Sequence, residues 1–231
     1  MYLTMSDLRS REKLSRDFTF DYSTRHSRYM VNYNTLVIQA GFLQDFMFNE
    51  NMPLVLNLAT AGRSMAHEIT HGFGDKGKEY NGDGKHVNWW SDYATSKFNE
   101  KKNCFVEQYG SIFDPLTNKS VDGNRTLEEN IADNGGMRVA YQAYLRVTED
   151  KPEVTLPGLE KFTQDQLFFL SFATAWCVRE DVKLLRPGDT HARTRFRVNV
   201  PLQNMEEFAS AFHCPRGSTM RLSDGDRCIM W

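Results

Sequence analysis

The apolar positions of the chain fall mainly into blocks whose length and spacing are those of helices. Within these blocks, apolar residues recur every three or four positions or fill a run that is too long for a strand. Five stretches have this character: residues 54–73, 89–109, 126–147, 164–180 and 205–212. Only residues 195–200 alternate as a strand does. The pattern predicts a mainly α fold in one compact unit with little β structure.

The segments between the blocks carry signals of their own. Thr126-Leu-Glu-Glu129 fits a capping box, so we expect a helix to begin there. Residues 74–86 are rich in Gly, Asp, Asn and Lys, which predicts a loop. Residues 1–30 are polar and charged and show no sustained apolar period, which predicts a loose N-terminal segment.

Composition and charge narrow the possible partners. The 231 residues are 40% apolar and 25% charged, which is an ordinary globular balance. With 28 basic and 30 acidic residues, the formal net charge is only −2, and no long like-charged block indicates a nucleic-acid or membrane-surface partner. No run approaches the roughly 18 apolar residues that a membrane span needs. We therefore expect neither nucleic-acid binding nor a span within this chain.

The signals for cellular location disagree. The start of the chain lacks a basic and then apolar secretion signal, which taken literally indicates the cytosol. Two glycosylation sequons, at Asn118 and Asn124, favour a secretory route instead, as do four scattered cysteines without a CxxC pair. Location is thus left open by these features.

The segment His67-Glu-Ile-Thr-His71 carries the clearest chemistry. Residues four apart lie on one face of a helix, so His67 and His71 can direct two imidazoles at a single ion, with Glu68 beside them. Zinc accepts imidazole nitrogen and carboxylate oxygen in a tetrahedral shell, and a catalytic site leaves the fourth position for water. The spacing therefore supplies two zinc ligands and a general base.

A third ligand is expected from Glu129, in Glu129-Asn-Ile-Ala-Asp133. Asp133 lies one helical turn after Glu129, where it can accept the spare N–H of a zinc-bound imidazole and fix its tautomer. The alternative is a surface helix with two chance histidines. The apolar surroundings of the motif argue against it, because an unliganded His-Glu-His cluster is costly to bury.

With these motifs, the sequence resembles the neprilysin and endothelin-converting-enzyme family of zinc endopeptidases. The resemblance covers about residues 36–231, so we divide the chain into a segment 1–35 and a catalytic domain 36–231. It rests on motifs spread along the chain: HEITHGF at 67–73, NWW at 88–90, QYG at 108–110, ENIADNGG at 129–136, LPGL at 156–159, QLFF at 166–169, WC at 176–177 and the terminal CIMW at 228–231.

The resemblance implies a gluzincin-type, thermolysin-like catalytic lobe, one zinc ion, oligopeptide substrates and an anchored extracellular ectodomain. It also implies a transition-state role for His191 and a substrate clamp in Arg197. Phe42 and Met47 are the corresponding apolar pocket residues, together with Phe48.

The four cysteines allow two internal bridges by number alone. The family pattern implies one bridge within the chain, between Cys104 and Cys228. The family partners of Cys177 and Cys214 belong to an N-terminal lobe, which this sequence does not contain, so these two are expected to be free.

The sequence also departs from the family at the substrate site. The segment His26-Ser-Arg-Tyr29 stands where a substrate-binding Asn-Ala-Tyr-Tyr strand is expected. Arg63 stands among positions that are normally apolar, so it either selects an acidic substrate side chain, pairs with a carboxylate, or points into solvent.

The resulting hypothesis is peptide hydrolysis by a zinc-activated water, with Glu68 as general base. The rival hypothesis is a non-catalytic member that keeps the zinc fold as a peptide-binding scaffold. The absent lobe favours the scaffold, whereas the intact Glu68 favours the enzyme, because a scaffold needs only the ligands.

Overall fold

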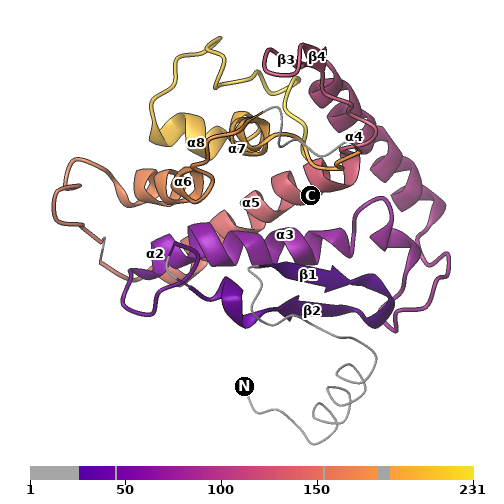
Figure 1. Ribbon diagram of the computed structural model, residues 1–231, viewed down its shortest axis with the longest axis horizontal. Coiled ribbons are helices and arrows are strands. Elements are labelled where there is room, and N and C mark those ends of the chain that lie inside the picture. The colour runs from indigo at the N-terminus through magenta and orange to yellow at the C-terminus, as the bar shows by residue number, and fades with distance from the viewer. Residues whose placement is uncertain (1–25, 45, 153, 182–187) are drawn as a thin grey trace, which may run out of the picture.

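The computed structural model describes residues 26–44, 46–152, 154–181 and 188–231, and most of the regular structure in them is helical (Figure 1). A mainly α fold is thereby confirmed. The helices are α2 (Leu54–Asn57), α3 (Arg63–His71), α4 (Asp92–Gly110), α5 (Leu127–Thr148), α6 (Gln164–Ala175), α7 (Thr194–Gln203) and α8 (Glu206–Ala211). Short 3-10 turns occupy Val31–Tyr33, Ala40–Phe42 and Gly77–Glu79.

The predicted block 54–73 forms one continuous helical run. It starts as α2, widens into a π-helical stretch over Leu58–Gly62, and continues as α3. The hydroxyl of Thr60 donates to the carbonyl oxygen of Met47 at 2.6 Å, and the amide of Ala61 donates to the same oxygen at 3.1 Å. These bonds fasten the preceding loop to the wide turn, immediately before the helix that carries the HExxH motif.

The strand prediction for residues 195–200 is wrong, because these residues lie in helix α7. Phe196 and Val200 are both buried and stand four positions apart, so the apolar residues that suggested alternation also satisfy a helical period. Short segments fit both periods, and packing against the neighbouring helices decides between them.

The strands lie elsewhere. Strands β1 (Ser27–Met30) and β2 (Thr35–Ile38) pair antiparallel, with Ser27 opposite Ile38, and run beside α3 (Figure 1). This hairpin crosses the boundary placed at residue 35, and it gives residues 27–30 a regular structure that their polar sequence did not predict. A second, minimal hairpin joins β3 (Phe113–Asp114) to β4 (Lys119–Ser120).

The expected capping box at Thr126 does not form, although α5 begins where predicted. The Thr126 hydroxyl donates to the Asp122 carbonyl oxygen at 2.8 Å and accepts from the Asn130 side chain at 2.8 Å. It is therefore already committed within its own turn. A reciprocal capping box occurs instead at α6, between Thr163 and Gln166.

Helices α3 and α5 pack closely along each other at the centre of the fold (Figure 1). Two glycines of the ENIADNGG segment make this approach possible. A Cβ atom on Gly136 would lie 2.6 Å from the backbone nitrogen of His67, and one on Gly135 would lie 2.7 Å from the Thr70 side chain. No side chain fits at either position without moving α5 away from α3.

Two hydrophobic clusters surround this pair of helices. One includes residues of α3, α5 and α6, and stacked aromatic rings join α5 to α6, with the centroids of Tyr141 and Phe169 5.2 Å apart. The other joins α4, α5 and α7 to the C-terminal segment and contains the disulfide between Cys104 and Cys228.

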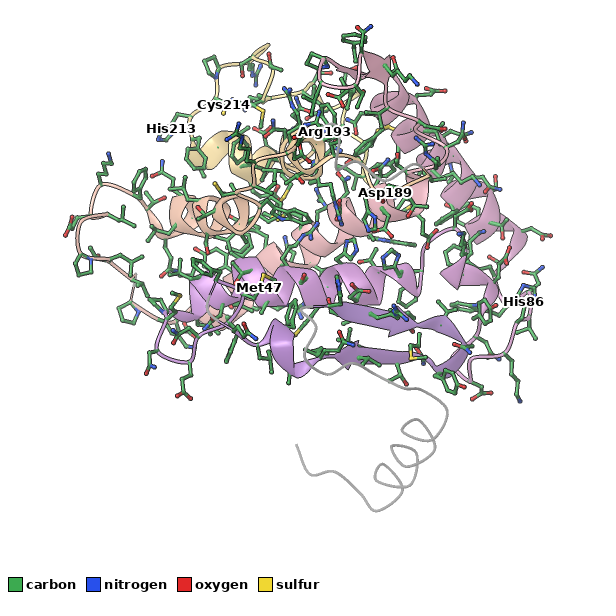
Figure 2. All side chains as sticks on the ribbon, viewed as in Figure 1. Met47, His86, Asp189, Arg193, His213 and Cys214 are labelled. Carbon is green, nitrogen blue, oxygen red and sulfur yellow. A yellow bond between two sulfur atoms is a disulfide. The ribbon has the colours of Figure 1, made fainter. Side chains whose placement is uncertain are left out.

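The structure thus contains the internal bridge that the family resemblance implies. Cys177 and Cys214 are free. Figure 2 labels Cys214 just beyond α8, on the side of the molecule away from the β1–β2 hairpin.

The close helix contact generates a first prediction. Gly136→Ala forces the added methyl group against the backbone of α3, so we expect unfolding by denaturant to show a loss of about 1–3 kcal/mol. The matched control is Gly110→Ala at the end of α4, where an added Cβ meets nothing within 4 Å. That control should be neutral or slightly stabilising. Equal stability of the two variants would contradict the close approach of Gly136 to the α3 backbone.

The disulfide generates a second prediction. Cys104 and Cys228 are 124 positions apart, so by the chain-entropy model the bridge contributes about 4–5 kcal/mol to the free energy of unfolding. Cys228→Ser should lose most of that stability, whereas Cys177→Ser should not. Non-reducing peptide mapping checks the pairing, and a bridge between Cys177 and Cys214 in monomeric protein would contradict it.

Candidate metal centre

Helix α3 presents both histidines of the motif on one face. The Nε2 atoms of His67 and His71 lie 3.1 Å apart, and the rings meet edge to face with centroids separated by 4.7 Å. Both side chains are largely buried, at 7% and 17% exposure. Two imidazole nitrogens this close on one helix face can both direct a lone pair at a single ion, which makes them candidate ligands.

The third donor comes from α5, which lies against α3 at this point. Glu129 Oε2 is 3.3 Å from His67 Nε2 and 3.7 Å from His71 Nε2. In a tetrahedral shell with zinc–ligand bonds of about 2.0–2.1 Å, ligand atoms lie about 3.3–3.4 Å apart. The three observed separations of 3.1, 3.3 and 3.7 Å bracket this value, so the donor set fits an ion of that size.

The state of Glu129 agrees with that fit. Its Oε2 atom is buried and makes no well-directed hydrogen bond within the described part of the chain. Burial alone would raise the pKa of this carboxyl group, but His191, His67 and His71 outweigh burial and hold the pKa well below its ordinary value. An ionised, underused carboxylate oxygen facing imidazoles is a suitable cation ligand.

Asp133 lies one turn further along α5 and touches the other side of His67. Its Oδ1 atom is 2.8 Å from His67 Nδ1, so that Nε2 of the same ring faces the cluster. Asp133 is fully buried, which raises the pKa of its carboxyl group, but Arg197 and Arg63 reverse the effect and hold that pKa well below the usual range. Asp133 therefore stays charged and orients the imidazole.

Arg63 pairs with a carboxylate, as one of the three sequence-based alternatives proposed, and the solvent-facing alternative is wrong. Its side chain is 3% exposed and its Nη2 atom contacts Asp133 Oδ1. Its guanidinium also lies over the rings of Phe172 and Trp176, 5.4 and 5.1 Å from their centroids. Burial lowers the pKa of Arg63, and the nearby Asp133 opposes that shift.

Arg197 grips the same carboxylate from α7. Its Nε and Nη2 atoms donate to the two Asp133 oxygens at 2.7 and 2.8 Å, and Nη2 lies 3.8 Å from Glu129 Oε2. The sequence predicted a substrate clamp here. The bidentate pair with Asp133 occupies two of its nitrogens, while the side chain still lines the cleft beside the metal cluster. Its role toward substrate stays a prediction.

Glu68 lies beside the two motif histidines and faces strand β1. Its carboxylate accepts from the Ser27 hydroxyl at 3.2 Å and from the Tyr29 backbone amide at 3.0 Å. The side chain lines a cleft of about 710 Å³ together with the two motif histidines. A carboxylate beside the metal cluster and open to the cleft has the position of a general base.

His191 reaches the cluster from the segment before α7. Its Nε2 atom is 3.1 Å from Glu129 Oε2, and its Nδ1 atom is 2.8 Å from Asp189 Oδ1. The contact with Glu129 raises the pKa of the imidazole, against burial. At 42% exposure, the ring is open to the cleft.

The predicted apolar pocket residues Phe42 and Met47 both line the same cleft, whereas Phe48 does not. Apart from Phe48 and from Asp133, which lies buried behind the cleft, the structure brings every predicted metal, catalytic and substrate residue together there. Sequence reasoning missed Glu128, whose Oε1 atom is 3.6 Å from His71 Nδ1, and Trp176, whose ring contacts both guanidiniums. Glu128 could have been suggested by its position directly before Glu129 in the sequence.

Comparison with known proteins supports the same assignment. The sequence model of peptidase family M13 matches residues 26–228. Neprilysin-11 of Caenorhabditis elegans is 39% identical over 235 aligned positions, covering 97% of this chain and 28% of that protein. An endothelin-converting enzyme homolog of Locusta migratoria is 41% identical over 212 positions, covering 90% of this chain and 28% of that protein.

Solved structures agree with the fold. The Haemonchus galactose containing glycoprotein complex superposes with a TM-score of 0.84 at 31% identity, covering 96% of this chain and 36% of that one. The zinc metalloprotease ZMP1 of Mycobacterium tuberculosis, solved with an inhibitor, superposes with a TM-score of 0.83 at 26% identity, covering 97% and 36%. Of the two curated relatives, Neprilysin-11 and the Locusta homolog, this chain covers only 28% of the length. None of the described helices is both long and apolar enough to cross a bilayer.

The geometry of the donor set generates a third prediction. Glu129→Ala removes one of three protein ligands, so zinc affinity should fall severely. Metal analysis after dialysis against limiting zinc measures this directly. Glu149→Ala, on an exposed glutamate at the end of α5, is the matched control and should retain the metal. Unchanged zinc content in Glu129→Ala would show that the ligand set is wrong.

Proposed function

The chain belongs to peptidase family M13, and from that premise we propose that it forms the catalytic part of a zinc endopeptidase that hydrolyses oligopeptides. One observation carries the proposal: His67, His71 and Glu129 gather three donor atoms within 4.8 Å of one another, with Glu68 beside them on an open cleft. We propose one zinc ion per chain, held by these three side chains. When bound, zinc supplies Lewis acidity that polarises a carbonyl group and lowers the pKa of water.

Glu68 acts as the general base in this proposal. Its carboxylate accepts a proton from the attacking water and later delivers it to the leaving amine. The Ser27 hydroxyl and the Tyr29 amide hold the carboxylate in place between α3 and the hairpin. Positioning by two donors limits its motion, so the base does not need to reorganise at the moment of reaction.

His191 and Arg197 stabilise the negative charge that develops on the scissile carbonyl oxygen. The His191 ring is held by Asp189 on one side and lies beside Glu129 on the other, so it can donate an N–H into the cleft. Arg197 adds a fixed positive charge next to the same place. Asp133 acts through His67 and Arg197, and is a positioning residue.

The part of the relatives that this chain does not match is proposed to be its partner. The chain covers about a quarter of its curated relatives, and it exposes large apolar side chains near the free Cys177, including Phe46 at 84% exposure. We propose that an N-terminal lobe, as in the family, covers this face in the complete enzyme. An extracellular or cell-surface location follows from the same family membership.

The rival function, a zinc-containing peptide-binding scaffold, rests on the same coverage. It differs from the enzyme at Glu68, because a scaffold requires the metal ligands but no base. Replacing the Glu68 side chain therefore distinguishes the enzyme from the scaffold.

A fourth prediction follows. Glu68→Gln should keep full zinc content but lose about 10²–10⁴-fold in peptide cleavage, because the amide cannot accept the water proton. Quenched fluorescent oligopeptides measure the rate, and a chelator should abolish it in the parent. Glu100→Gln, on an exposed glutamate of α4, is the control and should cleave normally. A zinc-loaded parent that cleaves no peptide in a broad library would favour the scaffold.

A further inference from the structure

Arg63 occupies an unusual position for a buried cation. It begins α3 and lies one helical turn before His67, so both side chains lie on one side of the helix, and both contact Asp133. Although it is only 3% exposed, its side chain forms part of the wall of the cleft that contains Glu68. A substrate group that binds to Arg63 from the cleft therefore lies one turn of α3 away from the proposed zinc ligand His67.

The guanidinium has donors to spare. An arginine side chain carries five N–H donors. Within the described chain, Arg63 makes one side-chain hydrogen bond, from Nη2 to Asp133, and its Nε is buried without a hydrogen-bond partner. Arg197, by contrast, commits Nε and Nη2 to the same carboxylate. Nε is enclosed, but Nη1 makes no hydrogen bond within the described chain and is not fully enclosed, so it is the donor group that an acceptor from the cleft can reach.

The charges behind the cleft are unequal. Two guanidiniums, Arg63 and Arg197, share the single carboxylate of Asp133, which leaves one positive charge in excess among the three. Three glutamates, Glu68, Glu128 and Glu129, also line the cleft, as do the cations Arg28 and Lys76. Together with the divalent ion of the proposed centre, the positive charges exceed the negative ones. An anionic group entering beside Arg63 therefore meets a positive surplus.

The surroundings fix the guanidinium and shield it from water. Its plane is held over the rings of Phe172 and Trp176, and the cleft wall beside it includes Phe42 and Met47. Electrostatic attraction is screened less in such apolar surroundings than at the surface. A planar fork held in one orientation also matches the geometry of a carboxylate.

From these observations we propose that Arg63 forms a subsite for an acidic side chain of the substrate, on a residue that flanks the scissile bond. The proposal rests on the proposed peptidase function and names its substrate class: peptides with Glu or Asp next to the cleaved bond. Arg63 is then a specificity-determining residue and contributes its unused N–H donors to the substrate carboxylate.

The test compares matched peptides that differ only by Glu or Gln, placed in turn on each side of the cleaved bond. The zinc-loaded parent chain should show a kcat/KM at least tenfold higher for the Glu peptide at one of the two positions. Arg63→Met should reduce that ratio to near or below one. Arg195→Met, on an exposed arginine of α7 outside the cleft, is the matched control and should keep the parent's ratio.

Binding provides a readout that does not depend on turnover. In Glu68→Gln protein, calorimetry with the same peptides should show the same preference for Glu, and Arg63→Met added to that background should remove it. Selective binding without any cleavage in the parent would support the subsite while overturning the proposed peptidase function. Cleavage with equal rates and affinities for Glu and Gln peptides would overturn the subsite and leave the peptidase function standing.

A purely structural role for Arg63 predicts a different result. Arg63→Met would then lower thermal stability or zinc content and change the rates for both peptides by the same factor, which would overturn the proposal. Arg63→Lys keeps the positive charge but lacks the planar guanidinium, and it replaces Arg63→Met in the test if that variant does not fold. It should retain a weakened preference for Glu. Because the parent's preference is measured first, its absence overturns the subsite whatever the variants do.

Discussion

The close packing of α5 on α3 is the constraint on which the rest of the structure depends. The candidate metal donors come from both helices, with two imidazoles on α3 and one carboxylate on α5. The separations of 3.3 and 3.7 Å between Glu129 and the two imidazoles therefore exist only while the two backbones stay close. Gly135 and Gly136 set that distance, because any side chain there would meet α3 itself. On the same helix, Glu129 lies about two turns and Asp133 less than one turn before these glycines. Local backbone geometry and site chemistry are thus encoded in one eight-residue segment.

Asp133 joins the remaining parts of the site. Its Oδ1 atom lies 2.8 Å from His67 Nδ1 on one side, and it accepts from two guanidiniums on the other, so one buried carboxylate faces a proposed metal ligand and holds Arg63 and Arg197 at the back of the cleft. Burying such charges is expensive unless each is paired, and removal of the shared carboxylate would leave two cations without compensation. The network therefore contributes a defined arrangement of charge at the site more than it contributes net stability.

The sequence predicted the helical blocks and two pairs within the candidate donor set, because these depend on short-range spacing. Residues four apart share a helix face whatever the rest of the fold does, which is why His67, His71 and the Glu129–Asp133 pair could be identified. The β1–β2 hairpin could not, because each strand has only four residues and is held by its partner strand and by α3. Helix α7 was mistaken for a strand because Phe196 and Val200 fit two periods at once. The environment of Arg63 depends on residues 70 to 113 positions away, Asp133 and Trp176, and no local pattern reports such contacts.

The departure from the family at His26–Tyr29 has a physical resolution in the hairpin. Glu68 receives one of its two hydrogen bonds from a backbone amide, that of Tyr29, and a backbone donor is present whichever side chain the position carries. The second comes from the small hydroxyl of Ser27. What positions Glu68 is therefore the path of the strand, fixed by its pairing with β2, and only secondarily the identity of its side chains. The hairpin can thus lose the expected asparagine and still hold the proposed base. By contrast, Arg63 changes the charge of the cleft wall itself. The arginine at position 63 leaves the fold in place but changes which substrate side chains the cleft can bind. We therefore expect this chain to differ from its relatives in substrate selectivity more than in reaction chemistry.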